Sequence, residues 1–139
     1  MPNDQPTVDN PLHIGAHRFY VHHGAVPVVV YHGDAAPSDV AAITARVGDY
    51  SPRVVIVDVS DLGAYDLAAR KELIKRSAEG ESGAVDITIY ICGADVVRRA
   101  LMTLAATAAR VMSKHRLVIL HRKRLEDALA DVDALLERA

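Results

Sequence analysis

Four consecutive β-branched apolar residues, Val54, Val55, Ile56 and Val57, most constrain how this chain can fold. A strand with one face in solvent alternates apolar and polar residues, whereas a strand that is apolar at every position is buried on both faces. Such strands belong to sheets that are covered by other elements on each side. The run therefore predicts a buried strand over 53–58 in the sheet of an α/β domain.

The remaining segments alternate between strand and helix patterns. β-branched and aromatic residues predict further strands over 17–22, 26–32, 85–91 and 116–120. The first two of these strands are expected to form a hairpin. Apolar spacing, caps and glycine stops predict helices over 37–47, 67–78, 94–112 and 123–137. The order β-β-α-β-α-β-α-β-α predicts an α/β fold with a mixed, mostly parallel sheet packed by helices.

Composition limits the classes of protein to which this chain can belong. Hydrophobic residues make up 50% and charged residues 24% of the 139 residues, which excludes disorder for most of the chain. Cys92 is the single cysteine, so no internal disulfide forms and a cytoplasmic location is expected. The first ten residues are too polar for a signal peptide, and no segment is apolar enough to predict an integral membrane span. Residues 1–14 are expected to be an irregular tail before one domain over 15–139.

The order of elements and several segments resemble the STAS domain (sulfate transporter and anti-sigma factor antagonist), in its branch of stand-alone bacterial antagonist-like proteins. The resemblance covers residues 15–138. It rests on the segments Val29 to Gly33 and Val54 to Leu62, on Tyr65 with Asp66, and on the placement of the last strand and helix, Leu117 to Leu136. It implies a non-enzymatic interaction module in bacterial signalling that docks an anti-sigma-type or other protein partner. No catalytic residue and no cofactor are expected.

The turn before the second helix departs from the family pattern. Anti-sigma factor antagonists read Asp-Ser-Ser/Thr-Gly there, and a kinase phosphorylates the first serine. Here the turn reads Asp66, Leu67, Ala68, Ala69, and Leu67 has no hydroxyl to phosphorylate. The resemblance therefore implies the docking surface without its phosphorylation switch.

The expected docking surface lies around this turn and the start of the preceding helix. Asp66 is also a natural N-cap for the second helix. Ser60 and Asp61 follow the buried strand, where ligands of open α/β sheets gather, although both residues are also ordinary in turns. The sequence leaves open whether Leu67 is exposed. The expected partner-binding residues are Ser38, Ser60, Asp61, Tyr65, Asp66 and Leu67.

A basic segment supports an alternative function. Residues 93–124 hold eight basic residues and one acidic residue, although the chain carries a net charge of −2. Either this is a solvated face, or it binds an acidic protein, a nucleotide, another phosphate-bearing ligand or a lipid headgroup. Nucleic acid is not expected, because the chain is not basic overall and aromatic residues make up only 4%. The candidate residues are Arg98, Arg99, Arg110 and Lys114.

The long helix carries two adjacent apolar stripes. The stripe expected to cover the sheet contains Val97, Leu101, Leu104, Ala108 and Val111. The second contains Met102, Ala105, Ala109 and Met112. It either packs on a neighbouring helix or forms an exposed apolar surface. We predict an exposed surface for self-association, as in a homodimer, or for partner docking.

The histidines do not predict a metal site. His17, His22, His23 and His32 fall in or beside the hairpin. Adjacent residues of a strand point to opposite faces, so His22 and His23 are expected to diverge if the strand continues. No ligand spacing typical of metal sites is present, and Cys92, at the end of an apolar strand, is expected to be a buried structural thiol.

Overall fold

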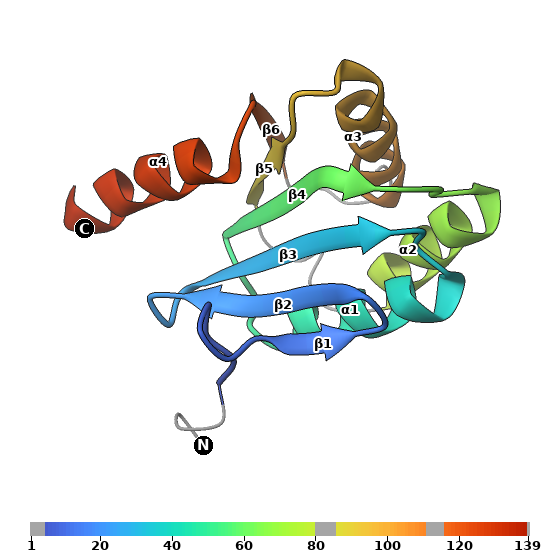
Figure 1. Ribbon diagram of the computed structural model, residues 1–139, viewed down its shortest axis with the longest axis horizontal. Helices are drawn as coiled ribbons and strands as arrows, with labels where there is room; N and C mark the ends of the chain where they lie inside the picture. Colours follow the sequence, from blue (N-terminus) through green and yellow to red (C-terminus); the bar gives the residue numbers. More distant parts are fainter. Residues whose placement is uncertain (1–4, 80–85, 111–115, 139) are drawn as a thin grey trace.

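The computed structural model describes residues 5–79, 86–110 and 116–138, which form an α/β fold with a mixed six-stranded sheet and four helices (Figure 1). The strands are β1 (Leu12–Ile14), β2 (His17–His22), β3 (Val26–Gly33), β4 (Val54–Leu62), β5 (Ile87–Cys92) and β6 (Leu117–Arg122). The helices are α1 (Pro37–Gly48), α2 (Leu67–Glu79), α3 (Val96–Arg110) and α4 (Leu125–Arg138). Within these residues no helix has the length and apolar character needed to cross a bilayer.

The strands lie in the sheet in the same order as in the sequence. β1, β2 and β3 are antiparallel neighbours, and β3, β4, β5 and β6 are parallel. Right-handed crossovers that always step in one direction place their helices on the same face of a sheet. Accordingly α1, α2 and α3 share one face, while α4 follows the last strand and packs on the other (Figure 1).

The burial of the apolar run on both faces of the sheet confirms the sequence prediction for β4. Val55, Val57 and Val59 are buried in the core under α1, α2 and α3, and Ile56 is buried in the second core under α4. β3 alternates in the same way, with Val29 on the first face and Val28 on the second. Each of these strands therefore contributes to two cores at once.

The first strand, β1, was missed by the sequence patterns. Leu12–Ile14 falls in the segment predicted to be an irregular tail, yet it pairs antiparallel with β2 and packs Leu12 and Ile14 against the first core. Even upstream of β1 the chain is attached, because the Val21 amide donates to the carbonyl of Pro6 at 3.0 Å. Three residues are too few to show a period of two, so only pairing with β2 defines this strand.

The orientation of α3 corrects the expected self-association surface. Met102 and Ala105 are buried in the core, so the prediction that they mediate self-association is wrong for both. Val97 and Leu104, from the stripe expected to cover the sheet, are exposed instead. The side chain of Ala109 and the whole of Met112 lie outside the described residues. Because both stripes are apolar, the helix could be rotated either way, and packing against the sheet and α2 selects the stripe with small alanines.

Substituting each stripe in turn tests this orientation. Met102→Asp places a carboxylate at a side chain that is 4% exposed, so we expect the free energy of unfolding to fall by at least about 3 kcal/mol. Leu104→Asp changes a side chain that is 65% exposed and should stay within about 0.5 kcal/mol of the wild type. Urea denaturation of the two variants measures the difference. Equal destabilisation of both variants would contradict the placement of α3.

Candidate functional site

The carboxyl ends of β3 and β4 meet at one edge of the sheet, where α1 and α2 begin (Figure 1). The loops that follow these two strands are hydrogen-bonded to each other. The Gly63 amide donates to the Gly33 carbonyl at 2.7 Å, the Ala35 amide donates to the Ala64 carbonyl at 2.9 Å, and the Ala64 amide donates to Asp34 Oδ1 at 2.8 Å. A Cβ at Gly63 would collide with the Asp34 carboxylate, so this close approach requires glycine. The paired loops form a fixed base for the residues of the expected docking surface.

At this edge the turn before α2 exposes its leucine. Asp66 Oδ1 accepts a hydrogen bond from the Ala69 amide at 3.0 Å, which confirms the predicted N-cap. Leu67 is the first residue of α2 and is 57% exposed. The question that the sequence left open is therefore answered: the side chain of Leu67 faces solvent.

The polar residues Ser38, Ser60 and Asp61 are also exposed, and hydrogen bonds to Asp58 orient Ser60. The Ser60 hydroxyl donates to Asp58 Oδ1 at 2.6 Å. Asp61 Oδ2 lies 3.6 Å from Nδ1 of His32, at the end of β3. Ser38 is exposed in the first turn of α1. The structure thus brings five of the six predicted docking residues to one edge, with Ser38 on α1 and the others on β4 or at the start of α2.

Tyr65 is the exception and corrects the prediction. Its side chain is 3% exposed and packs edge-on against Tyr31, with ring centroids 5.9 Å apart. Burial raises the pKa of Tyr65 to about 12, so its hydroxyl stays neutral. Tyr65 is part of the core beneath the turn and is not available to a partner.

A shallow groove runs between α1 and α2 near the same edge. Its lining combines small apolar residues with two polar ones: Pro37, Ser38, Ala41, Ala42 and Glu72. Small side chains leave room between the helices, and the groove opens to solvent. This edge therefore carries both an exposed leucine and an open groove of mixed polar and apolar lining.

The structure describes the side chains of two of the four residues of the predicted basic patch, Arg98 and Arg99. Arg98 is held within the fold: its Nε donates to the Leu62 carbonyl at 2.6 Å and its Nη1 donates to Asp95 Oδ2 at 2.8 Å. Arg98 therefore fixes the start of α3 to the end of β4. Arg99 is only partly exposed. The side chain of Arg110 and the whole of Lys114 lie outside the described residues.

Cys92 is buried at the end of β5, as the sequence predicts. Burial raises the pKa of its thiol to about 12, so the nucleophilic thiolate is scarce at neutral pH. The position therefore suits a structural thiol.

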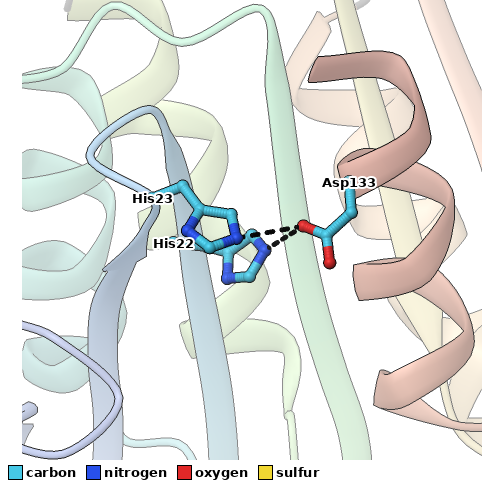
Figure 2. Close-up of side chains that lie close together, drawn as sticks. All are labelled: His22, His23 and Asp133. Atoms are coloured by element: carbon cyan, nitrogen blue, oxygen red, sulfur yellow. Dashed lines mark hydrogen bonds and ion pairs between the residues drawn. The ribbon is translucent and has the colours of Figure 1, made fainter. Parts of the chain in front are cut away.

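The sequence analysis missed one cluster, which joins two of the histidines to a carboxylate. His17 is buried, and its Nδ1 accepts a hydrogen bond from the His32 amide at 2.9 Å. By contrast, the rings of His22 and His23 lie side by side and both face Asp133 of α4 (Figure 2). β2 ends at His22, so the alternation expected for a continuing strand does not apply. Neighbouring histidines beside a turn were the available signal, but Asp133 is too distant in sequence to be linked to them.

Comparison of the chain with protein-family models, with curated proteins and with solved structures finds no match. The STAS resemblance therefore rests on the sequence segments that carry it, and the function that it implies is a proposal.

The N-cap can be tested by two substitutions at Asp66. Asp66→Ala removes the acceptor for the Ala69 amide and should lower the free energy of unfolding by about 1 kcal/mol. Asp66→Asn keeps an oxygen acceptor and should lose much less. Chemical denaturation of both variants measures the cap, and equal stability of the alanine variant and the wild type would show that the bond contributes nothing.

The buried thiol gives a second test. At about pH 8, native Cys92 should resist alkylation by iodoacetamide, because the side chain is covered and the thiolate is scarce. The urea-unfolded chain should be alkylated completely under the same conditions. Mass spectrometry follows the added mass, and rapid modification of the folded protein would contradict the burial of this residue.

Proposed function

We propose that this chain is a non-enzymatic, STAS-like protein-interaction module in bacterial signalling, acting in the cytoplasm. Its docking surface consists of Ser38, Ser60, Asp61, Asp66 and Leu67. The observation that carries the proposal is the exposed Leu67 at the start of α2. A large exposed apolar side chain at an edge that also carries an open groove is typical of a protein-binding surface rather than of a solvated helix end.

The charges around Leu67 indicate the kind of partner. Asp66, which precedes the leucine, and Asp61, near the end of β4, are exposed and acidic. A partner would therefore present an apolar contact for Leu67, surrounded by basic side chains. An anti-sigma-type protein is the partner class that the resemblance implies.

The leucine also determines how docking is regulated. In the antagonists that this chain resembles, phosphorylation adds about two negative charges at the corresponding serine and disrupts docking. Leu67 cannot be phosphorylated, and its side chain adds apolar area to the surface. We therefore propose a module whose docking at this position is not controlled by a kinase.

The alternative proposal is a module that binds a nucleotide, another phosphate-bearing ligand or a lipid. It has less support, because Arg98 is already bonded to the Leu62 carbonyl and to Asp95. A native mass spectrum of the purified protein distinguishes the two proposals. A retained mass of small-molecule size would favour the alternative, and the mass of the bare chain would favour docking.

Photo-crosslinking tests the docking surface directly. A photoreactive amino acid at position 67 should give a crosslinked protein partner in the native host, whereas the same group at position 135 should not. Leu135 is a matched control, because it is also an exposed leucine but belongs to α4, on the opposite face of the sheet.

The partner identified in this way is then titrated with purified variants. Leu67→Asp should weaken its binding by about tenfold or more, and Leu135→Asp should leave it unchanged. Equal binding by the wild type and Leu67→Asp would show that the docking surface lies elsewhere.

A further inference from the structure

Two neighbouring histidines and one aspartate converge at the end of the sheet opposite to the docking surface. His22 is the last residue of β2, His23 lies in the turn before β3, and Asp133 lies in α4 (Figure 2). One ligand atom from each of the three residues lies within 4.8 Å of the others. We propose that His22, His23 and Asp133 bind one divalent transition-metal ion of the zinc class.

The backbone conformation of the turn makes this convergence possible. His23 has a φ of 50°, in the left-handed region that residues other than glycine adopt infrequently. The chain turns there, so the His23 ring lies on the same side as the His22 ring, with centroids 4.0 Å apart. Two adjacent imidazoles can therefore approach the same carboxylate oxygen, which an extended strand would prevent.

One distance between ligand atoms already matches that of a tetrahedral ion, and a second needs a small adjustment. Two ligand atoms that are each about 2.05 Å from a tetrahedral zinc ion lie about 3.3 Å from each other. His23 Nε2 is 3.3 Å from Asp133 Oδ1. His22 Nε2 is 2.7 Å from the same oxygen, the length of a hydrogen bond, and would need to move away by about 0.6 Å. Asp133, whose side chain is 45% exposed, has the freedom to make this adjustment.

The chemistry of the three ligands selects the class of ion. Two imidazoles and one carboxylate suit zinc, copper or nickel, whereas magnesium and calcium prefer sites made of oxygen ligands. The ion would replace the hydrogen bond between His22 and Asp133 and hold both imidazoles by their Nε2 atoms.

Space for a further ligand lies beside the cluster. A hollow that opens to solvent is lined by His23, Asp133, Leu136 and Glu137. Three protein ligands leave at least one coordination position of zinc for water or another small ligand, and the hollow gives that position access to solvent. Glu137 lies one helical turn after Asp133, so a second carboxylate borders the same space.

The bound ion would join two parts of the chain that are far apart in sequence. Asp133 is 111 residues after His22. A metal ion bound by both would fix α4 to the hairpin between β2 and β3, and binding to the folded state alone would stabilise the fold. The site is separate from the docking surface, so it is independent of the proposed function.

Isothermal titration calorimetry with zinc chloride tests the site on protein without a histidine tag. We expect one zinc ion per chain, and no binding of magnesium or calcium under the same conditions. His23→Ala and Asp133→Asn should each weaken zinc binding by about tenfold or more, since changes even to outer-shell partners of a metal cost 10-fold to 100-fold. Both side chains are substantially exposed, so the variants should fold.

The matched control is His32→Ala. His32 is as exposed as His23 and its ring also lies near a carboxylate, at 3.6 Å from Asp61, but among the described residues it belongs to no group of three possible metal ligands. Zinc affinity should not change in this variant. A zinc-dependent rise in the urea midpoint, present in the wild type and in His32→Ala but lost in Asp133→Asn, would show that the ion holds the folded state. Absence of zinc binding, or binding unaffected by His23→Ala, would overturn the proposal.

Discussion

The structure depends on covering β4 from both sides. Its backbone is hydrogen-bonded to β3 and β5, and its side chains enter two separate cores, so no edge or face of its central residues remains in water. A strand in this position needs no polar residues, which explains the four consecutive β-branched residues. The same requirement calls for two layers of helices, and α4 alone supplies the second layer.

The two proposed sites lie at opposite ends of the parallel strands. At the carboxyl edge, paired loops after β3 and β4 hold Asp66 and Leu67 in place, and Arg98 fixes the start of α3 beside them. At the opposite end, α4 packs against the face that includes the start of β3 and brings Asp133 to the β2–β3 turn. The proposed docking surface and the proposed metal site therefore involve different elements.

The predictions from the sequence that proved wrong share one physical cause. The sequence of α3 has apolar residues on two stripes, so its period predicts a helix but not which stripe is buried, and Met102 rather than Leu104 entered the core. β1 is too short to show a pattern and exists only because β2 offers an unpaired edge. Tyr65 follows a strand and reads as a loop residue, but its ring packs on Tyr31 beneath the turn. Each case is decided by a neighbour that is distant in sequence or invisible to local patterning.

The sequence by itself determined the α/β class, the buried β4, the four helices and the Asp66 cap, because these follow from side-chain period and from bonds between residues a few positions apart. It also placed Ser60 and Asp61 at the carboxyl edge of the sheet, since parallel strands end at a common edge. Only the tertiary structure decided the rotation of α3, the exposure of Leu67 and the meeting of His22, His23 and Asp133. Those outcomes depend on how separate elements pack. The left-handed backbone conformation of His23 turns its ring to the same side as the ring of His22, where an extended strand would point the two rings apart.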